Sequence, residues 1–326
     1  EESQSVPLSV SAFGEDQIEA LKVRDLTNLA VGMPNVALDD VGTTRGTANF
    51  SIRGLGINSS IPSIDPTVGV VRDGVYLGVN NGIIFDTFDL ASIEVLRGPQ
   101  GTLFGRNVTG GAVLLNTRKP GDEFELRLRA AVDMGEEGGV NTYLMGSIGG
   151  PITDSWGARV TAYWNDDEGG FENQFTGDDF GEIEQTMIRP VVVWQPTDDL
   201  EMVFRYEYSE TEGQGPAAQS HTNGFGVPGA FANFKRDSFD FSVDEEGFQD
   251  NETNFFAWET NWNVGFGDGT ITNIFGWRDY DAESLSDIDA QPASMFHAPA
   301  WLKAEQFSNE LRYTGFFANR AAVTAG

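Results

Sequence analysis

From residue 124 onward, apolar and polar side chains alternate along the chain. In FELRLRAAVDM (124–134), Phe, Leu, Ala, Val and Met share one face, and Glu, Arg and Asp share the other. WGARVTAYW (156–164) places Trp156 and Trp164 at the two ends of one apolar face. A period of two predicts β-strands. An aromatic-ended apolar face opposite a charged face is typical of transmembrane barrel strands, with lipid outside and a polar lumen inside.

The alternation recurs in LEMVFRYEY (200–208) and FFAWETNWNVGF (255–266), and it predicts about eight antiparallel strands. We expect them near 124–134, 140–150, 156–165, 182–195, 200–210, 252–266, 269–281 and 303–315. The connections alternate between tight turns (PITDS, PTDD, GDG) and long acidic segments (166–181, 211–251, 282–302). Outer-membrane barrels typically alternate short turns, which lie in the periplasm, with longer loops on the outer side. Periodicity alone also permits a soluble β-sandwich or a glycan-binding sheet.

Residues 1–120 follow a different pattern. EDQIEALKVRDLTNLAVGMPNV (15–36) repeats apolar residues every three to four positions and predicts two short helices. The break between them is expected near Val23–Arg24, and Gly32 and Pro34 end the second. Five short strands are expected: one each in FSIRGLG, SIEVLRG and AVLLNTR, and two in VGVVRDGVYLG, which form a hairpin around Asp73–Gly74. The pattern predicts a small α+β domain over residues 1–120, followed by barrel strands over residues 121–326.

The segment ASIEVLRGPQGTLFGRNVTGGAVLLNTRKP (91–120) has the glycine content of a phosphate-binding loop. Such a loop requires Gly-x-x-x-x-Gly-Lys-Ser/Thr at the start of a helix. Here Gly101 and Gly105 are followed by Arg106 and Asn107, and the next residues have the pattern of a strand. We therefore interpret the glycines as residues of tight turns.

Together, VRDLTNLAVGMPNV (23–36), SIRGLG (51–56), VVRDGVYLG (70–78) and FDLASIEVLRGPQGTLFGRNVTGGAVLLNTRKP (88–120) resemble the plug domain of TonB-dependent outer-membrane receptors, in the family's order and spacing. The resemblance covers residues 7–120. It implies an α+β plug followed by an all-β antiparallel transmembrane barrel, and plugged barrels have ~22 strands. Because eight strands cannot enclose a plug and would leave open edges in lipid, we expect the chain to be part of a longer one.

The resemblance also implies a function. It indicates a receptor of the bacterial outer membrane that imports a scarce large nutrient, with a ferric siderophore first and a glycan, haem or a vitamin as alternatives. TonB and its inner-membrane energising complex would drive transport, and lipid and lipopolysaccharide would surround the barrel. No catalysis, cofactor or metal is implied, and no TonB-contacting segment is recognised before VPLSV (6–10). A soluble glycan-binding protein or a β-rich glycosidase is the alternative from another class.

Three groups of site residues are predicted from the resemblance. The first is a polar latch between the plug and the barrel wall, formed by Arg53, Glu94 and Arg97. The second comprises structural turns at Gly54, Asp73, Gly74, Gly98, Pro99, Gly101, Gly105, Gly110 and Gly111. The third comprises candidate ligand-facing residues at Asn58, Ser59, Tyr76, Asn80, Asn81 and Phe225.

Charge and composition narrow the partners. The formal net charge is -30, and residues 121–326 hold 37 acidic and 11 basic side chains. Such an acidic surface repels nucleic acid, whereas it suits cations. Acidic clusters such as Asp178–Asp179 offer oxygen ligands to Ca²⁺, although solvated loop charges are the simpler interpretation. The chain has no Cys, and its two histidines, His221 and His297, are far apart, so no thiolate or histidine metal site is predicted.

Overall fold

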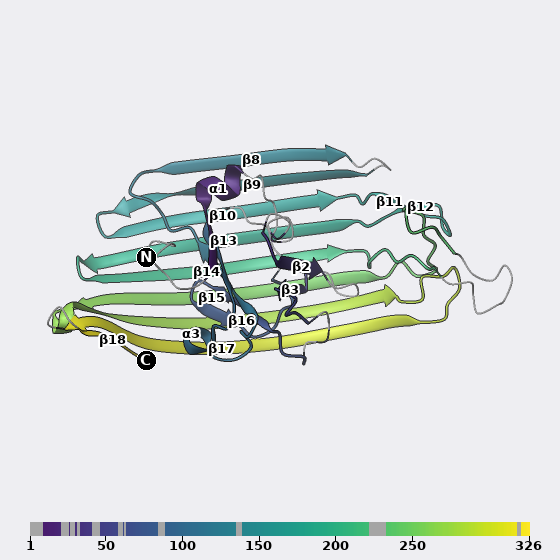
Figure 1. Cartoon of the computed structure of the whole chain (residues 1–326). Helices are drawn as coiled ribbons and strands as arrows, with labels where there is room; N and C mark the ends of the chain where they lie inside the picture. Colours follow the sequence, from purple (N-terminus) through teal and green to yellow (C-terminus); the bar gives the residue numbers. More distant parts are fainter. Residues whose placement is uncertain are drawn as a thin grey trace.

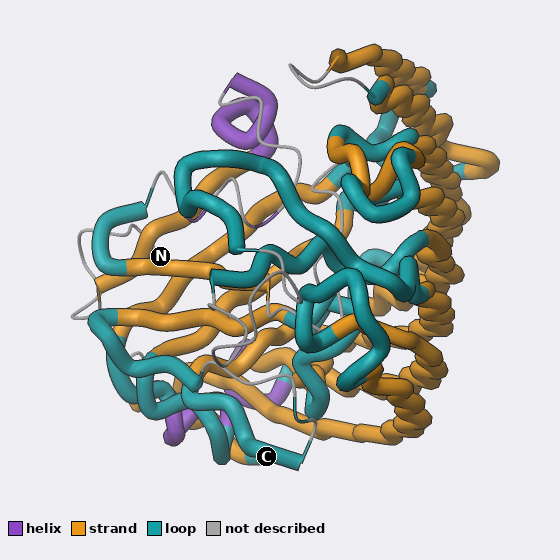
Figure 2. Tube along the Cα trace, turned by 90° about the vertical axis from the view of Figure 1, so that its right-hand side faces the viewer, coloured by secondary structure: helices purple, strands orange, loops and turns teal. Residues whose placement is uncertain are grey.

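The computed structural model describes residues 9–20, 26, 30, 33–40, 46–57, 61, 63–83, 89–134, 139–221, 233–317 and 321–326. A long, curved sheet forms one layer, called the wall below, and the N-terminal domain, called the plug, packs against its concave face (Figure 1). Figure 2 shows the wall as an arc beside the plug, seen from the end that carries the long connections. No helix in the described part of the chain is long and apolar enough to cross a membrane.

The wall is a nine-stranded antiparallel sheet. Its strand order is β18-β17-β16-β15-β14-β13-β10-β9-β8, in which neighbours in the sheet are also neighbours among the wall strands in sequence. The strands are β8 (Glu125–Met134), β9 (Val140–Thr153), β10 (Trp156–Asp167), β13 (Ile183–Thr197), β14 (Leu200–Gly213), β15 (Phe248–Val264), β16 (Gly269–Asp287), β17 (His297–Phe317) and β18 (Ala321–Ala325). All eight predicted strands are confirmed, and β18 is a ninth.

Side chains on the two faces of the wall alternate as the pattern predicts. Apolar residues on the convex face are exposed, since no protein covers them: examples are Leu126, Leu128, Trp156, Val160, Trp164, Ile188, Trp258, Trp262, Phe307 and Leu311. Trp156 and Trp194 stack at a centroid distance of 5.1 Å beside a tight turn. Between these positions, charged residues such as Arg159 and Arg205 point to the concave face and are buried against the plug. An apolar exterior with an aromatic rim fits a lipid-facing wall.

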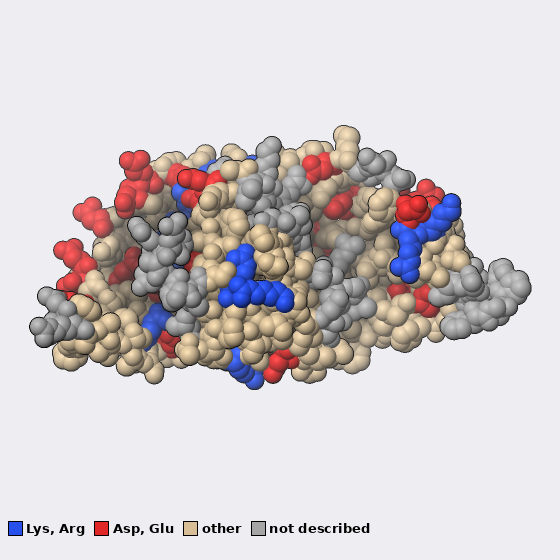
Figure 3. Space-filling view, viewed as in Figure 1, with Lys and Arg blue, Asp and Glu red and all other residues tan. Residues whose placement is uncertain are grey.

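The strands are longer at the long-connection end than the sequence predicts. β15 begins at Phe248 instead of 252, β16 continues to Asp287 instead of 281, and β17 begins at His297 instead of 303. The predicted loop 166–181 contains a small hairpin of β11 (Phe171–Asn173) and β12 (Asp178–Phe180). Phe171, Phe180, Phe241 and Val243 pack together there. The opposite end has tight turns, and Figure 3 shows acidic side chains gathered at it.

The plug is built on a five-stranded mixed sheet. Its order is β1-β6-β7-β4-β5, formed by β1 (Ser9–Gly14), β4 (Val68–Arg72), β5 (Val75–Leu77), β6 (Leu90–Arg97) and β7 (Gly111–Thr117). A second hairpin joins β2 (Val36–Asp40) to β3 (Ala48–Ile52). The helices are α1 (Glu15–Ala20) and the single turn α3 (Gly101–Phe104). The second predicted helix falls mostly on residues outside those described.

The plug and the wall share one hydrophobic core. Plug residues such as Ile52, Val70 and Ile93 cluster with Phe255 and Ala257 of the wall. Phe255 is 2% exposed, and burying such a side chain contributes about 1.5–3 kcal/mol. This shared core holds β4 and β5 against the middle of the wall and so positions the polar contacts described next.

Candidate functional site

An ion-pair cluster at the centre of the plug–wall contact is formed by Arg72, Glu207 and Arg189. Arg72, at the end of β4, donates from Nη1 to Glu207 Oε1 over 2.6 Å and from Nη2 to Oε2. Arg189 Nε lies 2.6 Å from Glu207 Oε2. The Arg72 guanidinium also lies 4.7 Å from the centre of the Phe255 ring. The three charged side chains are no more than 4% exposed, so their charges are balanced by one another and not by water.

Two further buried ion pairs join the plug to the wall, in addition to the more exposed pairs Arg118–Glu125, Lys119–Glu201 and Glu15–Arg127. Arg205 Nε lies 3.3 Å from Asp73 Oδ1, in the β4–β5 turn. Asp89, just before β6, accepts a hydrogen bond of 2.8 Å from Arg159 Nε and another from the Thr161 hydroxyl. The side chains of Asp73, Asp89 and Arg159 are nearly inaccessible to solvent. Breaking a buried pair of this kind costs about 3–5 kcal/mol.

The segment that follows β5 is held by hydrogen bonds to neutral groups. Arg278 on β16 donates to the carbonyl oxygens of Val79 and Asn81. Gln306 on β17 accepts from the Gly78 amide over 2.8 Å and donates to the Tyr76 carbonyl over 2.6 Å. The strand register across β14 to β17 pairs Glu207 with Phe255, Phe255 with Arg278, and Arg278 with Gln306. One row across the wall therefore holds both the ion pairs and this segment.

The segment 76–82 lies closer to the long-connection end than the Asp73–Gly74 turn does. A Cβ on Gly74 would meet Ile274, whereas one on Gly82 would meet Tyr280 and Arg278. Because β16 runs from a tight turn at Gly269 towards the long-connection end, Tyr280 lies further along it than Ile274. This segment contains three of the predicted ligand-facing residues, Tyr76, Asn80 and Asn81.

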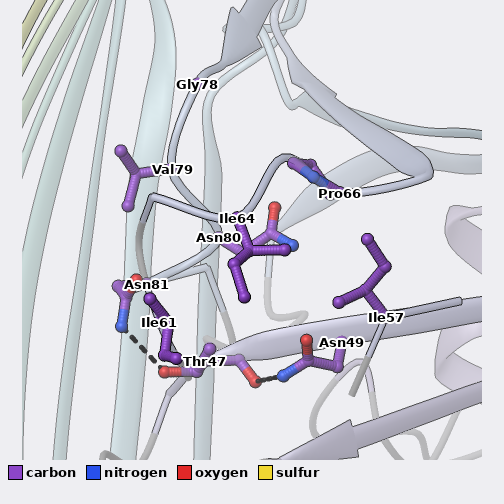
Figure 4. A pocket seen from close by; sticks show the side chains of 10 residues that line it. All are labelled: Thr47, Asn49, Ile57, Ile61, Ile64, Pro66, Gly78, Val79, Asn80 and Asn81. Carbon is purple, nitrogen blue, oxygen red and sulfur yellow. Dashed lines mark hydrogen bonds between the residues drawn. The ribbon is translucent and has the colours of Figure 1, made fainter. Parts of the chain in front are cut away.

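Figure 4 shows a small pocket beside this segment. It is lined by Thr47, Asn49, Ile57, Ile61, Ile64, Pro66, Gly78, Val79, Asn80 and Asn81. Asn81 Nδ2 donates to Thr47 Oγ1 over 2.9 Å, which fixes one side of the pocket. Asn80 Oδ1 is buried without a hydrogen-bond partner among the described residues. The cavity volume of about 20 Å³ accommodates roughly one water molecule, so a larger ligand would lie over the pocket and the exposed Ile61 and Ile64.

The structure brings only some of the predicted ligand-facing residues together. Asn80 and Asn81 line the pocket. Tyr76 does not: its ring packs beside Gly69, and burial raises the pKa of its hydroxyl. Asn58, Ser59 and Phe225 lie outside the described residues.

The residues predicted for the latch lie elsewhere in the plug. Arg97 donates from Nη2 to Ser11 Oγ over 2.9 Å, a contact between β6 and β1. Arg53 is exposed and adopts a positive φ of 55°. Neither Arg53 nor Glu94 forms an ion pair with a described wall residue. A latch role for these three residues stays a prediction, whereas the observed buried plug–wall ion pairs use Arg72, Asp73 and Asp89.

A signal for the wall partners was present in the sequence. Arg159, Arg189, Arg205, Glu207 and Arg278 each stand in the middle of a strand, on the face opposite the apolar one. A charge at that position faces the barrel interior, and a filled interior obliges it to find a partner. The sequence pattern does not show which plug residue that partner is.

Most of the predicted turn residues have the backbone conformation that a turn requires. Gly54, Asp73, Gly74, Gly98, Gly105 and Gly111 all have positive φ. At Gly111 there is also no room for a side chain, because a Cβ would lie 2.3 Å from the Leu96 carbonyl oxygen. Gly101 instead begins α3. These backbone angles permit turns and a close approach of strands, and a structural role for the nine residues stays a prediction.

Comparisons with known proteins agree with this architecture. Residues 2–112 match the family model described as the TonB-dependent Receptor Plug Domain. The iron-regulated outer membrane virulence protein of Vibrio cholerae is 27% identical over 165 residues, which are 48% of this chain and 24% of that protein. The pesticin receptor of Yersinia enterocolitica is 32% identical over 134 residues, which are 40% of this chain and 19% of that protein.

Two solved structures share the fold over nearly the whole chain. The ferric yersiniabactin uptake receptor of Yersinia pestis has a TM-score of 0.75 at 20% identity, covering 98% of this chain and 46% of that one. The ferripyoverdine receptor of Pseudomonas aeruginosa has a TM-score of 0.71 at 17% identity, covering 96% and 40%. The chain thus spans less than half the length of these structures and about a quarter or less of the curated relatives.

A mixed α+β plug seated by buried ion pairs against an antiparallel barrel wall defines the class of plugged barrels. Within that class, residues 2–112 are similar to the plug domain of TonB-dependent receptors, and the chain shares the fold of the solved receptors over nearly its whole length.

Proposed function

We propose that the chain is part of a TonB-dependent receptor of the bacterial outer membrane that imports a ferric siderophore. The observation that carries the proposal is the seated plug, whose segment 76–82 and pocket face the long-connection end. Named relatives include a ferrioxamine B receptor of Salmonella typhimurium and the iron-regulated protein of Vibrio cholerae. TonB and its energising complex are the proposed partners on the opposite side, and the proposal involves no covalent chemistry.

The pocket indicates how a cargo is recognised. The described residues of its lining carry no charged side chain, so apolar contacts to Ile61 and Ile64 and a hydrogen bond to Asn80 Oδ1 would hold the cargo. The long-connection end, in contrast, carries Asp244, Glu245 and Glu246 in one run. An acidic approach lowers the local concentration of anions and raises that of cations. We therefore propose a neutral or positively charged ferric complex as the cargo.

Binding to the purified receptor in detergent tests the proposal. Ferric hydroxamates of differing net charge are titrated while quenching of tryptophan fluorescence is followed, with haem, cobalamin and maltooligosaccharides as rival cargo. We expect a neutral or cationic ferric complex to bind. Asn80→Ala should weaken its binding about tenfold, because the substitution removes one hydrogen bond to a buried acceptor. Gln195→Ala, exposed at the tight-turn end, is the matched control. Binding of a rival cargo alone, or equal binding by both variants, would contradict the proposal.

Uptake gives the second test. Iron-starved cells that depend on this receptor should grow on the bound ferric complex when TonB is present and fail when TonB is deleted. Growth that is independent of TonB would remove the energised mechanism from the proposal, even if binding were confirmed.

A further inference from the structure

A group of three side chains at the long-connection end has the composition of a metal site. Asp244 lies in the segment between β14 and β15, Asp287 is the last residue of β16, and His297 is the first residue of β17. One potential ligand atom from each lies within 4.8 Å of the other two. Asp287 and His297 are directly opposite each other as the final pair of the β16–β17 ladder. The fold thus joins residues that are far apart in the sequence.

The contacts of the three residues leave a gap that a cation fits. His297 Nε2 lies 3.0 Å from Asp244 Oδ1. Asp287 Oδ1 accepts a hydrogen bond of 2.9 Å from the Ala290 amide, but its Oδ2 is buried and has no hydrogen-bond partner among the described residues. Asp287 is only 4% exposed. A buried carboxylate oxygen without a partner is costly, and the neighbouring imidazole is already directed at Asp244.

The surroundings add negative charge and no compensating base. Asp289 lies close enough to act on Asp287, and Glu245 close enough to act on His297. No described Lys or Arg forms an ion pair with any of these carboxylates. The one ion pair that they form among the described residues is that of Asp244 with His297. Even if the His297 imidazole is protonated, its single positive charge faces four carboxylates, those of Asp244, Glu245, Asp287 and Asp289. A divalent ion balances that excess far better than the histidine does.

We propose that Asp244, Asp287 and His297 bind a divalent transition-metal ion of the Zn²⁺ type. Two carboxylates and one imidazole are the donors that such ions accept, whereas Ca²⁺ prefers oxygen ligands alone. Around an ion with bonds of about 2.0–2.2 Å, tetrahedral ligand atoms stand roughly 3.4 Å apart. The present separations need small side-chain adjustments only. Three protein ligands leave at least one coordination position for water or an external donor.

The ion would connect separate parts of the long-connection end. The Asp244 amide already donates to the Gln291 carbonyl over 3.2 Å, so the segment that precedes β15 lies against the β16–β17 connection. A shared metal would strengthen that attachment (Figure 1, the end where β11 and β12 are labelled). The site is separate from the pocket of the plug, and it does not depend on the identity of the imported nutrient.

The test uses the complete receptor in detergent after treatment with a chelator. Zn²⁺ is titrated against a chromophoric chelator, and Co²⁺ binding is followed by its visible absorption. We expect one tightly bound ion per receptor. His297→Gln and Asp287→Asn should each weaken Zn²⁺ binding at least tenfold. His221→Gln, the other histidine, and Asp178→Asn, an exposed acid of β12, are the matched controls and should bind as the unmodified receptor does.

Two results would overturn the proposal. One is the absence of stoichiometric Zn²⁺ binding by the unmodified receptor; the other is equal binding by His297→Gln. If either variant fails to fold, the unmodified receptor still decides the matter. Zn²⁺ should raise its thermal midpoint and give a Co²⁺ spectrum of mixed nitrogen and oxygen ligation. A shift of the midpoint by Ca²⁺ as large as that by Zn²⁺ would indicate a site made of carboxylates alone and would also refute the proposal.

Discussion

Replacement of Glu207 by Gln should release the plug from the wall. Glu207 compensates both Arg72 and Arg189, and these side chains are 4% and 2% exposed. The substitution preserves the shape of the side chain but removes the negative charge that both buried guanidinium groups contact. Removal of one partner from a buried pair costs about 3–5 kcal/mol. The equilibrium constant for opening the plug should therefore rise about 100-fold or more.

The absence of Cys from the chain offers a direct assay. Ala257 on β15 is 0% exposed and belongs to the core that the wall shares with the plug, so a single thiol placed there by Ala257→Cys is labelled only when the plug leaves the wall. Labelling rates in the native receptor then report the opening equilibrium, while circular dichroism reports the integrity of the wall. We expect the Glu207→Gln receptor to be labelled at least 100-fold faster, with an unchanged wall.

Glu201→Gln provides the matched control for this experiment. Glu201 stands on the same strand and pairs with Lys119 over 2.6 Å, but the two side chains are 33% and 39% exposed. An exposed pair contributes about 0–1 kcal/mol, so labelling should change by less than about fivefold. If Glu207→Gln and Glu201→Gln accelerate labelling equally, burial is not what makes the central cluster strong, and the reasoning fails.

Two further substitutions test the backbone of the plug and the orientation of the wall. Gly111→Ala should destabilise the plug by more than about 2 kcal/mol, because a Cβ would lie 2.3 Å from the Leu96 carbonyl oxygen. Gly121→Ala is the control, since a Cβ at Gly121 has open space. Equal urea midpoints for the two variants would disprove the close approach at Gly111. Val160→Arg, on the convex face of β10, should impair insertion into lipid vesicles by about 2–4 kcal/mol. Asp166→Arg, further along the same face towards the long-connection end, should cost less than about 1 kcal/mol, and equal insertion of both would show that this face does not meet lipid.

The wall was predictable because its apolar exterior imposes a period of two over each strand. Where both faces become polar, that signal disappears. In β15 the residues Phe248 to Asn251 and in β16 the residues Ala282 to Asp287 continue the ladder, but their composition is that of a loop. The sequence therefore predicts the lipid-facing part of each strand and underestimates the part beyond it.

The partners of the buried charges were not predictable in the same way. Arg72 and Glu207 are 135 residues apart in the sequence, and their contact depends on how the plug is seated in the wall. The resemblance directed attention to Arg53, Glu94 and Arg97, whereas the position of β4 against β14 selects Arg72. Likewise, Asp244 and His297 meet only because the end of the β16–β17 hairpin lies beside the segment before β15.

The strand order of the plug determines how it would respond to tension. In the described part of the chain, β1 is an edge strand that pairs with β6 alone, through residues 9–14. The strand that carries Arg72, β4, lies three places further into the sheet. A pulling force applied to the N-terminal end is borne first by the short β1–β6 ladder, while β4 remains fastened to the wall by charge. The first strand is thus a mechanical element that can be peeled away at low load, before the seat of the plug bears any force.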